Sequence, residues 1–291
     1  MESKSIFDFI GNTPLIRAKN ILKKDGVSLY LKLEGNNPGG SVKDRPAYNM
    51  ISSALQRKDI KKGDYLIEAT SGNTGIALAM IAKQFGLNIE LVMPENSTKE
   101  RVQTMRAYGA KVTLTPSEVG IEGSRIYAEK LVRDKGYFML NQFANDDNWK
   151  AHYYTTAPEI WEQTEGKVTH VIMTLGTTGT AIGVTRRLKE YEKNVRTIAV
   201  EPYMGHKIQG LKNMKESYVP GIFRRAEPYQ ILNIPDEEAF TKARQLAERE
   251  GIFVGMSSGA ALVIARKKAE ELTHGTIVVI FPDGGERYLS T

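Results

Sequence analysis

The sequence of 291 residues contains no cysteine. A disulfide, a thiolate metal site and a thiol nucleophile are therefore all excluded. The chain also lacks an uninterrupted apolar run of about eighteen residues, which a membrane-spanning helix would need. No positively charged leader with an apolar run follows Met1, so a secretory signal is not indicated. We therefore expect a cytoplasmic protein that does not interact with a membrane.

Charge of one sign is not concentrated anywhere along the chain. The sequence has 40 Lys and Arg against 34 Asp and Glu, a formal net charge of +6, and the two signs are interleaved. A nucleic-acid-binding protein would show a basic stripe with interleaved aromatic residues, so no nucleic-acid partner is expected. The four histidines have no metal-ligand spacing, so we interpret them as structural or surface residues and expect no metal. They are His152, His170, His206 and His274.

Short runs of β-branched and aliphatic residues alternate with longer helical patterns almost from end to end. This alternation is typical of a parallel α/β architecture, and the length allows one large domain or two smaller ones. Segment 201–228 is irregular because prolines and glycines interrupt it, which is typical of a binding loop or lid. The predicted strands are 29–33, 65–69, 89–93, 111–115, 168–174, 197–200 and 276–281, and the predicted helices are 73–84, 98–108, 122–135, 149–163, 180–191, 236–250 and 258–272.

One lysine stands out by its position. Lys43 lies in the run Gly-Gly-Ser-Val-Lys-Asp-Arg at residues 39–45, where small residues precede what we expect to be a helix start. A lysine in such a place can reach into a cleft as an amine and form a Schiff base. On its own, a lysine at a helix start is most often a solvated surface charge.

Three further loops, rich in glycine and hydroxyl groups, each precede a predicted helix. Residues 70–75 read Thr-Ser-Gly-Asn-Thr-Gly, residues 176–180 read Gly-Thr-Thr-Gly-Thr, and residues 255–259 read Gly-Met-Ser-Ser-Gly. Exposed backbone N–H groups at the positive end of a helix can bind a carboxylate or a phosphate. Taken singly, each loop also suits an ordinary turn between a strand and a helix.

Taken together, these loops resemble one family closely, the O-acetylserine sulfhydrylase (cysteine synthase) group of fold type II pyridoxal 5′-phosphate (PLP) enzymes. The resemblance runs from Ile-Gly-Asn-Thr-Pro-Leu at 10–15 to Gly-Glu-Arg-Tyr-Leu-Ser at 285–290, and it is closest to the B-type. It implies two three-layer αβα domains with mostly parallel twisted sheets. The smaller, mobile domain would be 36–145, and the larger PLP-binding domain would combine 1–35 with 146–291.

The resemblance also implies a role for each candidate site residue. Lys43 would carry PLP and later move the α-proton of the bound amino acid. Ser257 would lie beside the ring nitrogen of PLP, where a hydroxyl leaves the nitrogen largely unprotonated. Asp283 would lie near the same edge of the ring, where an ionised carboxylate favours a protonated nitrogen. The Asn73 side chain would also bond the 3′-oxygen of the ring. The substrate carboxylate would be bound by Thr70, Ser71, Gly72, Asn73, Thr74 and Gln142, and the PLP phosphate by Gly176, Thr177, Thr178, Gly179 and Thr180.

The implied reaction is a β-replacement that makes L-cysteine from O-acetyl-L-serine and sulfide through an α-aminoacrylate intermediate. A cysteine desulfhydrase, or a synthase for cystathionine or another thiol product, would use the same residues. The B-type usually has an Arg-Arg-Trp run that is linked to thiosulfate, whereas this chain has Lys-Asn-Met at 212–214, so the sulfur acceptor stays open.

The resemblance also implies partners. Members of the group are commonly homodimers, and some bind the C-terminal tail of serine acetyltransferase in the site. A non-catalytic scaffold that only binds such a tail is the alternative of another class, but the intact Lys43, Asn73 and Ser257 argue against it.

Overall fold

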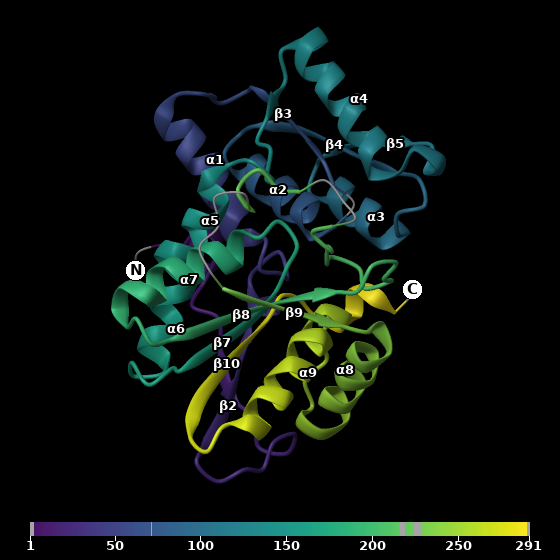
Figure 1. Ribbon diagram of the computed structural model, residues 1–291. Coiled ribbons are helices and arrows are strands. Elements are labelled where there is room, and N and C mark those ends of the chain that lie inside the picture. The colour runs from purple at the N-terminus through teal and green to yellow at the C-terminus, as the bar shows by residue number, and fades with distance from the viewer. Residues whose placement is uncertain (1–2, 71, 216–218, 224–228, 290–291) are drawn as a thin grey trace. The chain divides into compact units, whose positions relative to one another are not determined.

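The computed structural model describes residues 3–70, 72–215, 219–223 and 229–289. The chain divides into two compact units (Figure 1). The larger unit is formed by Met1–Val42 and Trp149–Leu289, and the smaller unit by Lys43–Asn148. Each unit has a sheet of its own, so each is a separate α/β body.

In the larger unit the described strands form one sheet in the order β1-β2-β10-β7-β8-β9. Strand β1 runs antiparallel to β2, and the other neighbouring strands are parallel. The carboxyl ends of the parallel strands therefore meet at one edge of the sheet, where ligands bind in open α/β folds. The strands are β1 (Leu15–Arg17), β2 (Val27–Leu33), β7 (His170–Thr174), β8 (Arg196–Pro202), β9 (Gln230–Ile234) and β10 (Gly275–Phe281).

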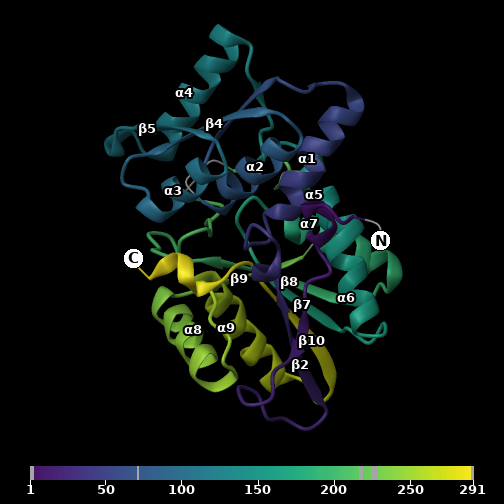
Figure 2. The ribbon, with the colours of Figure 1, turned by 180° about the vertical axis from the view of Figure 1, so that it is seen from behind.

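Helices cover both faces of this sheet because its central strands are apolar on both sides. In β10, Ile277, Val279 and Phe281 belong to the core shared with α8 and α9, whereas Val278 and Ile280 belong to the core shared with α6 and α7. Figures 1 and 2 show the two groups of helices on opposite sides of the strands. The helices are α6 (Ala157–Gln163), α7 (Gly179–Tyr191), α8 (Asp236–Glu250) and α9 (Met256–Glu271), with η1 (Ile6–Phe9), η2 (Glu34–Asn36) and η6 (Gly285–Tyr288) as short 3₁₀ turns.

The smaller unit has a parallel sheet in the order β5-β4-β3-β6. Ile67 and Val92 pack against Ala128 and Leu131 of α4 on one face, while α2, which neighbours α1 and α3, packs on the sheet as well. This unit is therefore also layered. Its elements are α1 (Asp44–Arg57), β3 (Tyr65–Ala69), α2 (Asn73–Gln84), β4 (Asn88–Pro94), α3 (Lys99–Ala107), β5 (Lys111–Thr115), η3 (Ser117–Val119), α4 (Gly120–Lys135), β6 (Phe138–Met139) and α5 (Asp146–Ala151), which continues into the larger unit.

The predicted α/β class with mostly parallel sheets is confirmed. Three strands were not predicted, namely β1, β6 and β9. β1 has three residues and β6 has two, which is too short for the alternation that marks a strand. The predicted strand 168–174 begins at His170 instead. Just before it, the Thr169 hydroxyl donates to the Thr276 carbonyl oxygen at 3.0 Å and accepts the Thr276 N–H at 3.0 Å.

The predicted single helix 149–163 is wrong in its interior. The chain forms α5, then a π-helical turn over His152–Thr156, and then α6. Gly183 on α7 explains the close packing at this turn, because a Cβ there would lie 2.2 Å from the Trp149 carbonyl oxygen and 2.8 Å from the His152 Cβ. A π turn inside a helix often marks a functional position.

Candidate active site

Lys43 begins helix α1 as its N-cap residue, and its carbonyl oxygen accepts the N–H of Ala47 at 3.0 Å. The residue before it, Val42, is the last of the larger unit and donates its N–H to the Pro282 carbonyl oxygen at 2.7 Å. Pro282 directly follows strand β10. Lys43 is therefore the next residue in the chain after Val42, which is hydrogen-bonded to the residue that follows strand β10.

The predicted carboxylate loop follows β3 and leads into α2. Gly72 is the N-cap residue of α2, and the Thr70 Oγ1 accepts the Gly72 N–H at 3.4 Å. The buried hydroxyl of Thr74 donates to the Gln142 Oε1 at 2.8 Å. Two predicted site residues that are far apart in the sequence are thus brought into contact. Asn73, which directly precedes Thr74, is the first residue of α2. Ser71 lies outside the described residues.

The loop 176–180 connects β7 to α7 in the larger unit. Gly176 passes close to another backbone segment, because a Cβ there would lie 2.9 Å from the Gly210 carbonyl oxygen. Thr178 is the N-cap residue of α7 and has φ +72°, a left-handed conformation that is unusual for a β-branched residue. Such backbone strain costs about 1–3 kcal/mol and is concentrated at ligand sites.

The Thr178 side chain adds a second sign of a ligand. Thr178 is 2 % exposed, and its Oγ1 has no hydrogen-bond partner in the described part of the chain. Buried hydroxyl groups are nearly always paired in native proteins. An unpaired hydroxyl beside the N–H groups that begin α7 fits an anionic oxygen such as that of a phosphate.

Ser257 and Asp283 belong to two segments of the larger unit that are hydrogen-bonded to each other. Ser257 is in the first turn of α9, which Gly255 caps, and the Gly255 N–H donates to the Asp283 carbonyl oxygen at 3.2 Å. The Asp283 carboxylate accepts a hydrogen bond of 2.5 Å from the Tyr288 hydroxyl. Gly255 has to be small here, since a Cβ would lie 2.2 Å from the Asp283 Oδ1.

His152 contacts the candidate site, a contact that sequence reasoning missed. This buried residue of the π turn has its Nε2 3.2 Å from the Thr180 Oγ1 and its Nδ1 2.9 Å from the Thr156 Oγ1. Its imidazole therefore links the loop 176–180 to the π turn. A histidine four residues before a threonine was the available signal, but it does not reveal the contact with Thr180.

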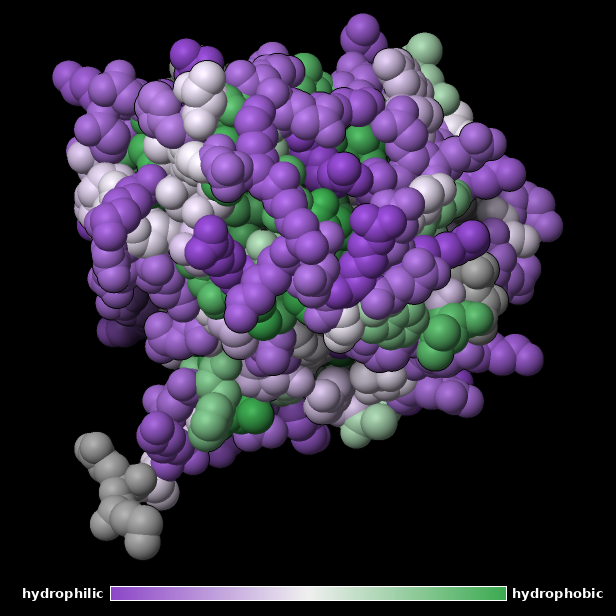
Figure 3. Space-filling view, turned by 90° about the horizontal axis from the view of Figure 1, so that it is seen from below, coloured by the Kyte–Doolittle hydropathy of each residue, from purple (hydrophilic) through white to green (hydrophobic). Residues whose placement is uncertain are grey.

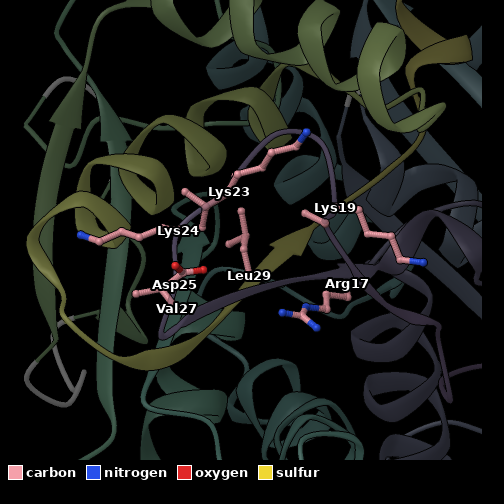
Figure 4. A pocket seen from close by; sticks show the side chains of 9 residues that line it. Arg17, Lys19, Lys23, Lys24, Asp25, Val27 and Leu29 are labelled. Carbon is pink, nitrogen blue, oxygen red and sulfur yellow. The ribbon is translucent and has the colours of Figure 1, made fainter.

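A surface pocket of about 470 Å³ lies in the larger unit, and none of the predicted site residues lines it. Figure 4 shows the charged ends of Lys19, Lys23 and Lys24 pointing in different directions, away from Leu29 in the middle. These cations do not converge on one point, so the pocket is not built to hold a single anion. The lining residues are Arg17, Ala18, Lys19, Leu22, Lys23, Lys24, Asp25, Val27 and Leu29.

Hydrophobic residues do not gather in one large area on the face seen in Figure 3. That face is largely hydrophilic, and hydrophobic residues show only as smaller areas between the polar ones. No helix among the described residues combines the length and the hydrophobicity that crossing a bilayer requires.

Comparison with known proteins gives a family match. The family model described as "Pyridoxal-phosphate dependent enzyme" matches residues 6–283. The chain is similar to "Cysteine synthase B" of Pseudomonas aeruginosa, with 47 % identity over 287 residues that cover 99 % of this chain and 96 % of the relative.

Solved structures agree with this match. A cysteine synthase of Entamoeba histolytica has a TM-score of 0.93 at 39 % identity, covering 100 % of this chain and 90 % of the other. A hydrogen sulfide-producing enzyme of Fusobacterium nucleatum has a TM-score of 0.91 at 40 % identity, covering 99 % of this chain and 100 % of the other. Proteins described by different activities, cysteine synthesis and hydrogen sulfide production, therefore share this fold.

Proposed function

Because this chain belongs to the pyridoxal-phosphate-dependent enzyme family, we propose that it makes L-cysteine from O-acetyl-L-serine and sulfide by β-replacement. The observation that carries the proposal is the similarity to a cysteine synthase B, at 47 % identity over 99 % of this chain. The chain also has a lysine at the start of helix α1. The predicted cofactor, PLP, is confirmed by the family match, and the substrates are small molecules.

We propose that the loop 176–180 of the larger unit binds the cofactor's phosphate. Gly176 and Gly179 would leave space for the backbone to approach it, and Thr177, Thr178 and Thr180 would supply hydroxyl donors. The unpaired Thr178 Oγ1 and the strained Thr178 backbone support this assignment. The start of α7 adds unpaired N–H groups, so the loop needs no cationic side chain to hold a phosphate dianion.

The Thr178→Val variant tests this assignment. The change removes the hydroxyl but keeps the β-branched shape, so we expect the Kd for PLP to rise by about tenfold, which corresponds to one hydrogen bond to a charged group. The thermal stability of the cofactor-free protein should change little, because that hydroxyl has no partner in the described chain. Equilibrium titration of the cofactor-free protein with PLP measures the Kd.

The matched control is Thr185→Val on the same helix. The Thr185 hydroxyl is buried and bonds the Thr197 hydroxyl at 2.9 Å, so its loss should lower thermal stability and leave PLP affinity unchanged. If the two variants lose PLP affinity to the same extent, the phosphate assignment of Thr178 is refuted.

We propose that the smaller unit binds the substrate carboxylate and moves the α-proton. Thr70, Ser71, Gly72, Asn73, Thr74 and Gln142 would hold the carboxylate, and the contact between Thr74 and Gln142 supports their acting together. When bound, PLP supplies an electron sink that stabilises the negative charge left on the α-carbon. Lys43 would hold the cofactor through its Nζ, and Asn73 would bond the cofactor's 3′-oxygen.

The proton movements assigned to Lys43 keep the reaction balanced. The substrate's amine would first displace the Lys43 Nζ from the cofactor. The freed Nζ would then take the α-proton while the bond to the acetate oxygen breaks and acetate leaves with the electron pair. Hydrosulfide would then form the new carbon–sulfur bond, and Lys43 would return the proton to the α-carbon. A fixed carboxylate sets the angle of the Cα–H bond, which is the positioning contribution of the Thr70–Thr74 loop.

We propose that Ser257 and Asp283 face the ring nitrogen of the cofactor. The Asp283 carboxylate accepts the hydrogen bond of the Tyr288 hydroxyl. An ionised Asp283 would favour a protonated ring nitrogen, whereas the Ser257 hydroxyl alone would leave that nitrogen largely unprotonated. A smaller mobile domain of 36–145, a homodimer, a cytoplasmic location and binding of the serine acetyltransferase tail stay predictions.

Sulfide is the sulfur donor that we propose. The run 212–214 is hydrogen-bonded to the end of β8. The buried Asn213 amide donates to the Pro202 carbonyl oxygen at 2.8 Å, and the Met214 N–H donates to the Glu201 carboxylate at 3.1 Å. Asn213 and Met214 are neutral, so the run 212–214 has one positive charge, on Lys212, where the B-type usually has two that are linked to thiosulfate. The similarity to a hydrogen sulfide-producing enzyme makes cysteine desulfhydration the second candidate.

A product assay separates these functions. Purified protein loaded with PLP is given O-acetyl-L-serine with sulfide, thiosulfate or homocysteine, and separately L-cysteine alone. We expect L-cysteine to form fastest with sulfide. Faster release of sulfide from L-cysteine would favour the desulfhydrase, and faster formation of cystathionine from homocysteine would favour the other synthase.

A further inference from the structure

Glu68 is a buried carboxylate of the smaller unit that the proposed mechanism does not use. It lies in β3 between Ile67 and Ala69 and is 3 % exposed. Its Oε2 accepts the N–H of Asn141 at 3.0 Å, and its Oε1 accepts the N–H of Gln142 at 3.2 Å. The two oxygens of this carboxylate therefore accept the N–H groups of two successive residues.

The burial of this carboxylate is costly. Burial raises the pKa of Glu68 to about 7, and the two backbone N–H donors lower it only in part. No cationic side chain of the described chain pairs with it. A glutamine of the same size would avoid the buried charge, but it would offer a single acceptor atom to the two N–H groups.

Gln142 is held at three of its polar groups. Glu68 accepts its N–H, the Asn148 side-chain amide donates to its carbonyl oxygen at 2.7 Å, and the Thr74 hydroxyl donates to its Oε1 at 2.8 Å. Asn141 beside it has φ +54°, so this backbone is a sharp turn that needs support. The Nε2 donors of Gln142 are the groups left for a ligand, and two donors of that kind suit a carboxylate.

We propose that Glu68 is a positioning residue for the substrate carboxylate, because it fixes the backbone of Asn141 and Gln142 and thereby aims the Gln142 amide. The inference rests on the proposed function, which supplies the amino-acid substrate, and it adds a residue that has no direct contact with that substrate. Glu68 is thus expected to affect recognition of the carboxylate and not of the rest of the amino acid.

The test compares two ligands that differ only in the carboxylate. L-Alanine and L-alaninamide both carry the amine and the α-carbon, but L-alaninamide lacks the negative charge. Their Kd values are measured on the PLP-loaded protein from the shift of its visible absorption. In Glu68→Gln we expect the preference for L-alanine over L-alaninamide to fall about tenfold, as for the loss of one well-aligned hydrogen bond, with the L-alaninamide Kd unchanged.

Two further variants exclude a merely structural effect. Glu90→Gln is the matched control, because Glu90 is a buried carboxylate of the neighbouring strand β4 that bonds Lys111 and Thr113 instead of Gln142. Its preference for L-alanine should equal that of the unchanged protein. Gln142→Ala should lose the preference, and adding Glu68→Gln to it should cause no further loss.

The outcomes separate the inference from the function. An unchanged preference in Glu68→Gln, or an equal weakening of both ligands, overturns the inference while leaving the enzyme reading intact. If Glu68→Gln does not fold, Glu68→Asp is read in the same way, because it keeps the charge but withdraws both acceptors by one methylene. A PLP-loaded protein whose absorption does not respond to L-alanine at all overturns the proposed function itself.

Discussion

The Lys43→Ala variant is expected to lose the visible absorption of the PLP-loaded protein and to form L-cysteine about 10³-fold more slowly or worse. The size follows from the removal of a positioned acid–base group, which typically contributes 10²–10⁴-fold, together with the covalent hold on the cofactor. Absorption spectra and the rate of cysteine formation from O-acetyl-L-serine measure the two effects.

Lys58→Ala is the control for this variant, because Lys58 is an exposed lysine at the other end of the same helix. It should keep both the absorption and the rate. If Lys43→Ala keeps them too, Lys43 is not the residue that holds the cofactor and moves the proton. If the unchanged protein stays colourless with PLP and forms no L-cysteine, the non-catalytic scaffold becomes the better interpretation.

The Lys32→Met variant is expected to lower the free energy of unfolding more than the other variants described above. The Lys32 side chain is fully buried, and its ammonium contacts the Glu159 carboxylate at 2.6 Å, the Gln163 Oε1 at 2.8 Å and the Thr13 carbonyl oxygen at 2.8 Å. Removing one partner of a buried ion pair leaves an uncompensated charge and costs about 3–5 kcal/mol. For a protein of this size that corresponds to a fall of roughly 10 °C in the thermal midpoint.

The double variant Lys32→Met with Glu159→Gln tests the cause of that loss. It removes the stranded charge, so part of the lost stability should return, as seen when buried ion pairs are replaced as a whole. Calorimetry of the three proteins gives the comparison. A Lys32→Met protein that melts within about 2 °C of the unchanged one would contradict the account of this buried network.

The elements with clear local signals were predicted correctly. Helices α2 and α8 have the predicted bounds. The backbone is extended at their N-cap residues, Gly72 and Pro235, and Gly251 ends α8 in the left-handed conformation. β6 and β9 were missed because their hydrogen bonds come from β3 and β8, so their short segments carry little strand signal of their own. The π turn depends on Gly183, about thirty residues further on.

The candidate site residues that lie in short sequence motifs could be predicted. Lys43 and the loops 70–75 and 176–180 have a recognisable order of small, hydroxyl and amine residues, and the structure adds the Thr74–Gln142 contact. Glu68 and His152 were not predictable, since an acid inside an apolar strand and a histidine in a helix have no such motif. Their role depends on contacts with Gln142 and Thr180 that only the folded chain brings about.

The most direct test of the central claim identifies the lysine that holds the cofactor. The PLP-loaded protein is treated with borohydride, which reduces a carbon–nitrogen double bond to a stable amine, and its peptides are then analysed by mass spectrometry. The account predicts a phosphopyridoxyl group on the peptide that contains Lys43. An unmodified Lys43 peptide, or the group on any other lysine, would contradict it.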